Sequence, residues 1–488
     1  MSAGSRAAAG LDVRGRRVTV MGLGLFGGGA GAARWALREG AIVTVTDLRD
    51  EETLGSSVDD LRALASDSEL RFVLGRHEAA DFDDADVVIV NPAVPPSSQW
   101  LTRARDSGAA ITTATAILLQ QLRARVVAVT GTNGKSSTVR FTADLLRSAL
   151  GNGVRVEAGG NLGGSLLGEA RDLGADDVVV LEMSSYQLEH LPADVAGVAD
   201  VALITNVGVD HLERHGTVEA YRDTKLRIVD LVGEDGVAIV PPGELAVLAS
   251  ERLGRACRTH GPGGGVALGE DGIVREGAVV LGDAGRLAVP GRFQRANLVA
   301  ALAAAHALGA PPEGLVRAIE GLTGLAHRME SLGTFELRPG GPVVEVVDNG
   351  VSTTPESTLA ALESLDDRRR GVLVAGGEPK RGVDADALAR RVADEGWTLV
   401  PFGAAAPQLV ELAREAGARV AAGALETAEE AATAALRVAA DEAAEVVLFS
   451  PACASFDRYP NFETRARAFR SAIQAGLGAP RPGAATER

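Results

Sequence analysis

Short apolar runs alternate with helix-like segments along most of the chain. In the first third, five apolar runs of strand length are separated by segments of helical character, of which 28–39 is an example. A strand–helix–strand succession predicts a parallel sheet with helices on its faces. The predicted strands of this part are residues 17–21, 42–46, 71–74, 86–90 and 109–113.

The same alternation returns in the middle and in the last third. A helical repeat over 139–150 follows a Gly-rich turn, and short Gly-punctuated apolar runs over 261–290 predict a small hairpin sheet. Further strands are predicted at residues 178–181, 201–205, 343–347, 371–375, 398–402 and 445–450, and a further helix at 295–308. We therefore predict an α/β protein of three domains, at residues 1–118, 119–325 and 326–488.

The length and composition limit the classes of protein that fit. A chain of 488 residues with 46% hydrophobic and 23% charged residues is typical of a folded protein with more than one core. The net charge of −16 and the 3% aromatic content disfavour nucleic acid or an acidic membrane surface as partner. Cys257 and Cys453 are too few and too distant for a disulfide framework or a cysteine zinc site.

The chain shows no targeting or membrane segment by pattern. Residues 1–17 lack the hydrophobic core of a secretion signal, and the longest apolar helix-like run, 296–310, is too short to cross a bilayer. We therefore expect a cytoplasmic protein.

The most informative segment is Gly131-Thr-Asn-Gly-Lys-Ser-Ser137, which follows an apolar strand and opens a helical pattern. Glycines let the backbone approach phosphates, and amides at a helix start point at them. A lysine neutralises charge, and a serine hydroxyl reaches Mg²⁺. Gly131 and Gly134 are closer together than in the usual Walker loop, so a plain strand–turn–helix joint is the alternative. Because both flanks fit, we predict a nucleoside triphosphate site.

A second Gly-rich turn, Gly22-Leu-Gly-Leu-Phe-Gly27, follows the first predicted strand, and Asp47 ends the next one. This arrangement is typical of a dinucleotide-type site, with a pyrophosphate over a helix N-terminus and an acid at the sugar. The motif does not distinguish NAD from UDP, and a Gly-rich turn without a ligand is the alternative.

Other candidate residues follow apolar strands or lie alone. Glu182 ends a strand downstream of the phosphate loop, where a Mg²⁺ ligand is expected, although an acid satisfied by backbone amides would fit as well. His211, Lys225 and Lys380 are isolated, and spacing alone does not bring them together. In the segment 450–457, a small buried hydrophobic role fits Cys453 better than that of a nucleophile.

In their order along the chain, these segments resemble the motifs of the Mur ligases, the ATP-dependent amide-forming enzymes of peptidoglycan precursor synthesis. The resemblance extends from Gly22 to about Gln474. It rests on Gly131–Ser136, Glu182-Met-Ser-Ser-Tyr-Gln-Leu-Glu189, Asn206, Asp210-His211, Lys225, His327-Arg-Met-Glu330 and 450–457. The block through Asn461-Phe-Glu463 is most similar to the branch of the family that adds D-glutamate.

The resemblance implies a role for each part of the chain. The first domain would be Rossmann-like and bind UDP, and the central domain would be a P-loop-type ATPase with a small extra sheet. The C-terminal domain would be Rossmann-like and bind the amino acid. The carboxylate of UDP-N-acetylmuramoyl-L-alanine would take the γ-phosphate of ATP, and the amine of glutamate would then displace phosphate from the acyl phosphate. We expect these small molecules as partners of a monomer, with no nucleic acid and no membrane.

The resemblance also implies site residues. Lys135, His211 and Lys225 would act in catalysis. ATP would be bound by Gly131, Thr132, Asn133, Gly134, Lys135, Ser136, Ser137, Asn297 and Arg328. The UDP-linked substrate would contact Gly24, Leu25, Phe26, Asp47, Arg49 and Asn161, and glutamate would contact Thr353, Lys380, Ser455 and Phe462. Two Mg²⁺ ions would be held by Ser136, Glu182, His211 and Lys225. A carbamylated Lys225 would suit this role, because Mg²⁺ takes oxygen ligands and repels an ammonium.

The segment Val347-Asp-Asn-Gly-Val-Ser-Thr-Thr-Pro355 departs from the D-glutamate branch. Val351 stands where that branch has a lysine near the substrate carboxylate, and Asn349 where it has an aspartate, with Asp348 one residue earlier. Phe293-Gln294 likewise replaces a common His-Asn pair. Ligation of L-glutamate is therefore the alternative.

Three other hypotheses explain less of the chain. A folylpolyglutamate-type ligase lacks the UDP-type first domain. An NAD-dependent dehydrogenase rests on 22–27 alone and leaves Lys135 unexplained. A nucleotide-binding module without catalysis is the third; if the chain is a ligase instead, replacing Lys135 by alanine should abolish its turnover.

Overall fold

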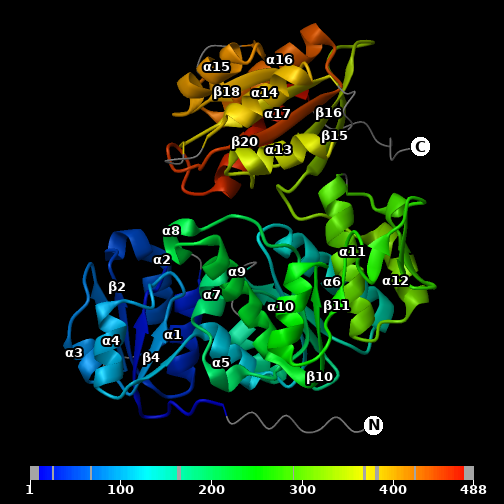
Figure 1. Cartoon of the computed structure of the whole chain (residues 1–488). Coiled ribbons are helices and arrows are strands. Elements are labelled where there is room, and N and C mark those ends of the chain that lie inside the picture. The colour runs from blue at the N-terminus through cyan, green and yellow to red at the C-terminus, as the bar shows by residue number, and fades with distance from the viewer. Residues whose placement is uncertain are drawn as a thin grey trace. The chain divides into compact units, whose positions relative to one another are not determined.

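The structure is a computed structural model (Figure 1) that describes residues 10–24, 27–65, 69–161, 166–289, 291–365, 370–379, 384–421 and 425–477. The described residues form an α/β protein with three large sheets and a small one, which confirms the predicted fold class. By compactness the chain divides into two units. The first is Met1–Arg286 with Asn297–Glu320, and the second is Leu287–Ala296 with Gly321–Arg488.

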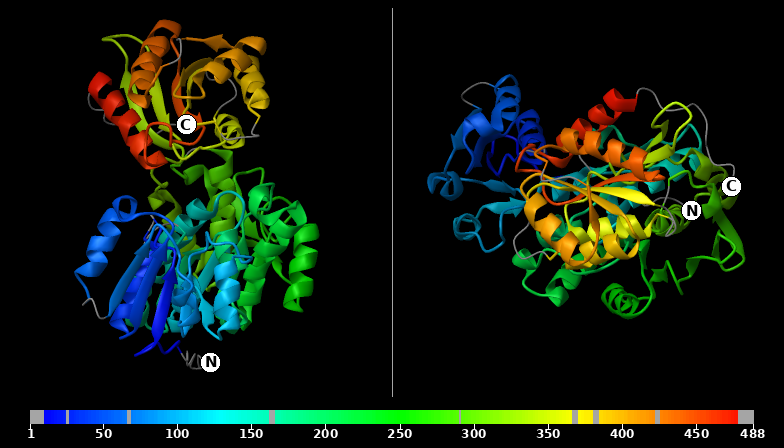
Figure 2. Two further views of the ribbon diagram at one scale, coloured as in Figure 1. Left: turned by 90° about the vertical axis from the view of Figure 1, so that its left-hand side faces the viewer. Right: turned by 90° about the horizontal axis from the view of Figure 1, so that it is seen from above.

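The first unit begins with a parallel sheet in the strand order β3-β2-β1-β4-β5. Its strands are β1 (Arg17–Met21), β2 (Ile42–Asp47), β3 (Leu70–Leu74), β4 (Val87–Val90) and β5 (Ala110–Thr112). Its helices are α1 (Gly28–Arg38), α2 (Glu51–Arg62), α3 (Ala80–Asp83), α4 (Gln99–Asp106) and α5 (Ala114–Gln121). Because side chains alternate along a strand, Val20 packs in a core with α1, and Met21 packs in another with α3 and α4. Helices therefore cover both faces (Figure 2).

The second sheet of this unit is also parallel, in the order β11-β10-β9-β6-β8-β7. Its strands are β6 (Arg125–Thr130), β7 (Val156–Gly160), β8 (Val178–Glu182), β9 (Ala199–Ile204), β10 (Val232–Val240) and β11 (Arg258–Thr259). Its helices are α6 (Lys135–Leu150), α7 (Ser185–Glu189), α8 (Leu212–His215), α9 (Val218–Leu226) and α10 (Glu244–Leu253). Since neighbouring parallel strands end at one edge, the residues after β6, β8 and β9 meet there.

A small antiparallel sheet follows, and it confirms the hairpin predicted over 261–290. It consists of β12 (Val266–Leu268), β13 (Ile273–Glu276) and β14 (Val279–Asp283). The helices α11 (Arg292–Ala307) and α12 (Pro312–Ala318) come next.

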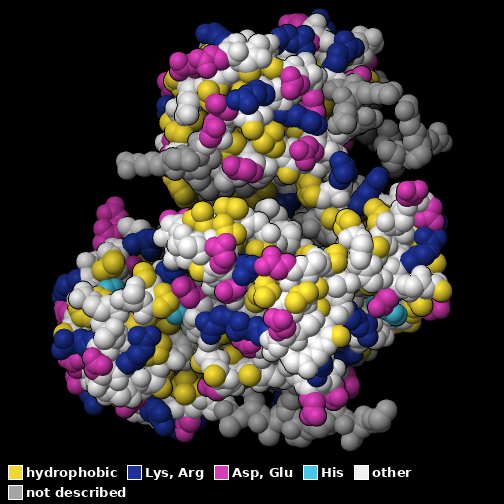
Figure 3. All heavy atoms as spheres, viewed as in Figure 1, with side chains coloured by type: hydrophobic (Ala, Val, Ile, Leu, Met, Phe, Trp, Pro, Cys, Tyr) yellow, Lys and Arg dark blue, Asp and Glu magenta, His cyan; other side chains and the backbone are white. Residues whose placement is uncertain are grey.

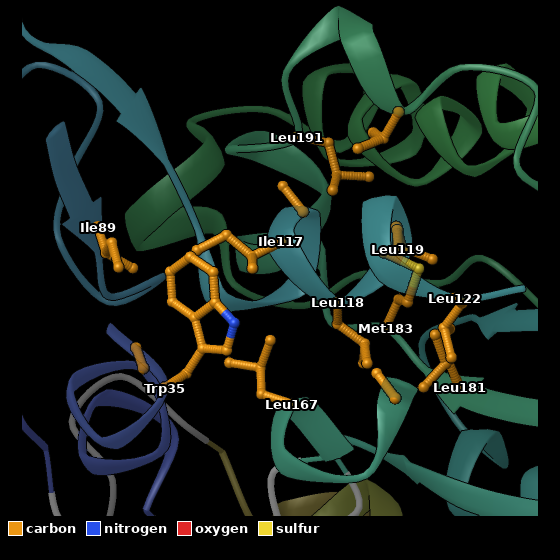
Figure 4. Close-up of a cluster of buried hydrophobic side chains, with 14 of the residues drawn as sticks. Trp35, Ile89, Ile117, Leu118, Leu119, Leu122, Leu167, Leu181, Met183 and Leu191 are labelled. Atoms are coloured by element: carbon orange, nitrogen blue, oxygen red, sulfur yellow. The ribbon is translucent and has the colours of Figure 1, made fainter. Parts of the chain in front are cut away.

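One hydrophobic core joins the helices of the first sheet to those of the second (Figure 4). Trp35 of α1 points toward Ile117 of α5 and Leu167, and the cluster continues through Met183 to Leu191. Replacing a buried tryptophan by alanine costs about 3–5 kcal/mol, so this cluster is a large part of what holds the two sheets together. The predicted boundary between residues 118 and 119 falls within α5, inside this unit. That boundary and the one between 325 and 326 stay predictions.

The second unit holds a mixed sheet in the order β15-β16-β20-β17-β18-β19, in which only the β15–β16 pair is antiparallel. Its strands are β15 (Glu330–Glu336), β16 (Val343–Asp348), β17 (Gly371–Gly376), β18 (Thr398–Phe402), β19 (Arg419–Val420) and β20 (Val446–Ala452). Its helices are α13 (Pro355–Glu363), α14 (Asp386–Asp394), α15 (Ala406–Glu415), α16 (Ala428–Glu442) and α17 (Phe462–Leu477). Cys453 is buried in this unit, as predicted.

The charge on the surface and the length of the helices can be compared with the predictions of no nucleic-acid partner and no membrane partner. On the face drawn in Figure 3, basic and acidic side chains of the described residues are interspersed. Every helix within the described ranges is too short or too polar to cross a membrane.

Candidate active site

The phosphate loop is the turn of residues 131–134 between β6 and α6. Gly134 caps α6 with φ of 80°, a left-handed conformation that costs a residue with a Cβ atom about 1–2 kcal/mol. A Cβ atom at Gly134 would lie 2.1 Å from Asn297 Oδ1, and one at Gly131 would lie 1.9 Å from Thr205 Oγ1. Glycine is therefore required at both positions, and the predicted ATP residue Asn297 lies against the loop although 163 positions separate it from Gly134 in sequence.

The segment after β9 braces this loop. Thr205 Oγ1 and Asn206 Nδ2 both donate to the Asn133 carbonyl, at 2.6 and 3.0 Å, and the Asn133 amide donates to Asn206 Oδ1 at 2.9 Å. The Thr132 amide donates to the Asn206 carbonyl at 2.9 Å. The turn is thus held by hydrogen bonds within the protein, and Ser136 and Ser137 lie buried at the helix start that it presents.

Two lysines meet at one carbonyl of the loop. Lys135 Nζ donates to the carbonyls of Gly131 and Thr132, both at 2.9 Å, and Lys225 Nζ donates to the Gly131 carbonyl at 2.7 Å. Lys225 is only 1% exposed. Burial, and next the Lys135 ammonium, lower the pKa of Lys225 to about 7, while Asp210 and Glu182 oppose the shift. A large fraction of Lys225 is therefore a neutral amine at physiological pH.

Glu182 at the end of β8 uses its two carboxylate oxygens differently. Its Oε1 accepts a hydrogen bond from Asn161 Nδ2 at 3.0 Å, whereas its Oε2 is buried with no hydrogen-bond partner among the residues that the structure describes. A buried carboxylate oxygen without a partner is costly, so it calls for a ligand. A cation such as Mg²⁺, which prefers oxygen ligands, fits this position.

His211 stands in a tight turn that begins α8, with φ of 50°. Its ring nitrogens lie 3.4 Å from Asp210 Oδ2, 3.3 Å from Glu213 Oε1 and 3.4 Å from the Tyr186 hydroxyl. Tyr221 lies between His211 and Lys225. The centroids of the Tyr221 and His211 rings are 6.3 Å apart, and Lys225 Nζ lies 4.5 Å from the centroid of the Tyr221 ring. The structure thus brings these two predicted metal ligands to one aromatic neighbour.

A cavity of about 1010 Å³ opens at the carboxyl edge of the first sheet. Gly24, Asp47, Arg49 and Asn161, which were predicted to contact the UDP-linked substrate, all line it. Buried Asp47 accepts the amides of Gly24 at 3.1 Å and Arg49 at 2.9 Å, which fixes the turn around the acid. The predicted contacts Leu25 and Phe26 lie outside the described residues.

Sequence reasoning missed several residues of this cavity. Asn91, which follows β4, donates to the Gly22 carbonyl at 3.2 Å, and the loop 92–98 after it forms a wall. Tyr186 and Gln187 of α7 form another wall, and Gln187 accepts the Ser184 amide in a capping box. The position of Asn91 after a predicted strand was an available signal, whereas the contribution of α7 depends on tertiary packing.

In the second unit, His327 belongs to a network of charged side chains. His327 Nδ1 lies 2.7 Å from Asp348 Oδ2, and Arg470 donates to the same oxygen at 2.5 Å and to Glu330 Oε1 at 3.2 Å. Asn349 instead donates to Ser450 Oγ at 3.0 Å. The acid that contacts the His327 ring is therefore Asp348. The predicted ATP residue Arg328 lies in the same turn, where its carbonyl accepts from Gln294 at 3.5 Å.

The predicted glutamate residues of this unit are only partly described. Ser455 is buried after β20, and Phe462 begins α17 with its ring 6.4 Å from that of His327. Thr353 lies in the loop after β16, and Lys380 is outside the described residues. Buried Arg465 donates to the carbonyls of Cys453 at 2.9 Å and Ala454 at 2.8 Å, and so shapes the loop in which Ser455 stands.

Comparisons with known proteins identify the family. The family models "Mur ligase MurD-like, N-terminal domain" and "Mur ligase middle domain" match residues 16–113 and 129–260. The chain is 34% identical to proteins named UDP-N-acetylmuramoylalanine--D-glutamate ligase from Roseiflexus sp. (strain RS-1) and from Geobacter metallireducens. Each alignment includes 95% of this chain, and the two include 99% and 98% of the Roseiflexus and Geobacter proteins, respectively.

Solved structures share the fold at lower identity. UDP-N-acetylmuramate-alanine ligase MurC from Thermotoga maritima matches with a TM-score of 0.58 at 20% identity, over 94% of this chain and 99% of that one. A pseudomurein peptide ligase type C from Methanothermus fervidus matches with a TM-score of 0.54 at 16% identity, over the same shares. The chain therefore belongs to the Mur ligase family and is an ATP-dependent, amide-bond-forming ligase of peptidoglycan synthesis that uses ATP and Mg²⁺.

Proposed function

We propose that this chain adds D-glutamate to UDP-N-acetylmuramoyl-L-alanine. The observation that carries the proposal is the position of Asn161, which lines the large cavity and also donates to Glu182 on the strand next to the phosphate loop. A substrate whose nucleotide end lay against Asp47 would extend toward this point. The names of the relatives at 34% identity support glutamate as the second substrate.

The proposed reaction proceeds in two steps. The free carboxylate of the alanyl group is a poor electrophile, so it first attacks the γ-phosphorus of ATP, and ADP leaves. The neutral amine of glutamate then attacks the acyl carbonyl, loses a proton, and phosphate leaves. Lys135, which the loop carbonyls hold beside the phosphate site, compensates part of the charge when two anions meet in the first step.

The donor set fits divalent cations. The unpartnered Oε2 of Glu182 and the hydroxyl of Ser136 would hold one Mg²⁺, and His211 with Lys225 would hold a second. Bound Mg²⁺ would supply charge compensation for the phosphates. The role of Ser136 follows from its position at the start of α6, directly after Lys135.

Lys225 serves this purpose only with an added oxygen donor, and we include its carbamylation in the proposal. Neutral Lys225 Nζ would attack CO₂, form an N–C bond and release a proton, which leaves an N–H and a carboxylate-like group. The remaining N–H can still donate to the Gly131 carbonyl, as Nζ does at 2.7 Å. The low pKa of Lys225, about 7, supplies the neutral amine that this reaction requires.

Two features of the second unit keep L-glutamate as the alternative substrate. Val351 replaces the lysine expected near the substrate carboxylate, and Asp348 is engaged by His327 and Arg470. These two features make the stereochemistry of the amino acid the point that most requires an experiment.

The deciding assay incubates the full-length protein with ATP, Mg²⁺, UDP-N-acetylmuramoyl-L-alanine and either enantiomer of glutamate. ADP release and the mass of the product are measured. We expect kcat/KM for D-glutamate to exceed that for L-glutamate by about tenfold or more. Faster turnover of the L form would replace the D assignment, and no ADP release with either enantiomer would refute the proposed reaction.

A further inference from the structure

A single guanidinium holds the loop that walls the large cavity. Arg214 donates to three consecutive backbone carbonyls, from Nη2 to Pro92 at 3.3 Å, from Nη1 to Ala93 at 3.1 Å and from Nη2 to Val94 at 2.9 Å. All three loop residues line the cavity. The Val94 carbonyl also lies 2.7 Å from Nε2 of His190.

The remaining nitrogen and the face of the Arg214 guanidinium contact α7, which forms another wall of the cavity. Its Nε donates to Glu189 Oε2 at 2.8 Å, and its guanidinium carbon lies 4.9 Å from the centre of the Tyr186 ring. Tyr186 itself lines the cavity. The Arg214 side chain is 11% exposed, so these contacts are shielded from water and are worth more than surface contacts.

Arg214 stands on α8, three residues after the predicted metal ligand His211. The Arg214 amide donates to the His211 carbonyl at 3.0 Å, so the two residues share one turn. The turn that carries His211 is therefore anchored to both walls of the cavity through Arg214.

We propose that Arg214 is a positioning residue that fixes the wall of residues 92–94 and ties it to the turn carrying His211. This inference rests on the proposed function, because it takes the cavity as the site of the UDP-linked substrate. Arg214 sets the distance between the nucleotide end of the substrate and the reacting carboxylate. A lysine keeps the charge but presents one compact ammonium, which cannot reach three carbonyls and a carboxylate in one plane.

The test compares Arg214→Lys with a matched control, Arg227→Lys. Arg227 likewise donates to two carbonyls at the end of α7, those of Glu189 at 2.7 Å and Leu191 at 2.6 Å, but neither residue lines the cavity. We expect Arg214→Lys to raise KM for the UDP-linked substrate about tenfold and to lower kcat, with KM for ATP unchanged within about twofold. The control should change each of these constants by less than about twofold.

A second variant and a binding assay keep the proposal falsifiable if Arg214→Lys is poorly folded. His190→Ala removes the other donor near the Val94 carbonyl and should raise the same KM about threefold. UDP can also be titrated while tryptophan fluorescence is followed, because Trp100 lines the cavity. Weaker UDP binding in Arg214→Lys than in Arg227→Lys supports the proposal.

Equal KM values in Arg214→Lys and wild type would overturn the proposal, as would a fall in kcat alone or an equal rise in KM for ATP. The UDP titration separates this failure from that of the proposed function. If Arg214→Lys binds UDP less well than the wild type, but the wild type forms no product with either glutamate enantiomer, the role of Arg214 in the cavity wall stands and the proposed reaction is refuted.

Discussion

The Nζ atom of Lys225 donates a hydrogen bond to the carbonyl of Gly131, 94 residues away and inside the phosphate loop. The same carbonyl accepts Lys135, so two potential cations share one acceptor. Burial and the Lys135 ammonium make the charged form of Lys225 unfavourable. Loss of the Lys225 proton weakens only its hydrogen bond to the Gly131 carbonyl, whose contribution is modest.

Stability should therefore rise with pH through Lys225. Its pKa is about 7 in the folded chain and near 10.5 in the unfolded chain, so between these values the unfolded chain binds the extra proton. The free energy of unfolding of the wild type, relative to Lys225→Met, should rise by up to about 1.4 kcal/mol per pH unit from pH 7 to 9. Urea unfolding in CO₂-free buffer with EDTA measures it, and a difference that is flat with pH would contradict the low pKa.

Activity should depend on dissolved CO₂ if Lys225 is carbamylated. Protein that has been dialysed at low pH and assayed in degassed buffer should lose most of its turnover, and bicarbonate should restore it with a slow lag. The matched control is Lys225→Gln, whose residual turnover should not respond to bicarbonate. Wild-type turnover that is indifferent to CO₂ would argue against the modification.

Removal of the Glu182 charge should separate stability from metal dependence. In EDTA, Glu182→Gln should unfold at the same free energy as the wild type or up to about 2 kcal/mol higher, because an amide of the same shape carries no buried charge. The Mg²⁺ concentration for half-maximal activity should rise about tenfold or more. Added Mg²⁺ should raise the melting temperature of the wild type more than that of the variant, which keeps the proposed second site at His211 and Lys225. An equal rise in the variant would place the ion elsewhere.

Gly134 and Gly151 cap the two ends of α6 with nearly equal φ angles, 80° and 79°, and with ψ angles of −6° and 176°. A methyl group at Gly151 meets no atom within 4 Å, whereas at Gly134 it meets Asn297 at 2.1 Å. Gly151→Ala should cost about 1–3 kcal/mol of stability and leave turnover intact. Gly134→Ala should cost more and reduce kcat by about a hundredfold or more. Equal effects of both substitutions would refute the role given to the close packing.

The network around Asp348 makes a further prediction for Arg470. This residue contacts two carboxylates, and Asp348 has no exposed surface. Arg470→Gln should lower the free energy of unfolding by about 2–4 kcal/mol, because it leaves a buried charge with fewer partners. Arg467 on the same helix is 71% exposed and 3.7 Å from Glu463, so Arg467→Gln should cost less than about 0.5 kcal/mol. Chemical denaturation of both variants provides the comparison.

The sequence pattern was sufficient for the fold class and for most buried strands. Runs such as that of β8 are apolar up to the terminal Glu182 and buried throughout, and this pattern identifies a strand buried on both faces. It was insufficient for β7, β10 and β15. The strand β15 is mostly half-buried and polar, and β10 begins with a polar stretch that interrupts its pairing with β9. These strands exist because neighbouring strands offer hydrogen bonds, which a local pattern does not reveal.

The candidate site could be predicted where topology alone brings residues together. The ends of β6 and β8 must meet at one edge, so Glu182 near the phosphate loop follows from the strand order. Two other features do not follow from the strand order. The contact of Gly134 with Asn297 depends on the packing of α11. The contact of His327 with Asp348 rather than Asn349 depends on the register of β15 on β16, which has a bulge between Ser331 and Gly333.

The tight packing at Gly131 and Gly134 also bears on antibacterial inhibitors. A compound that binds the backbone amides of this turn would contact positions at which any new side chain must first displace Thr205 or Asn297. Substitutions that blocked such a compound would damage the turn itself. Few single-residue routes to drug resistance would then remain at these two positions.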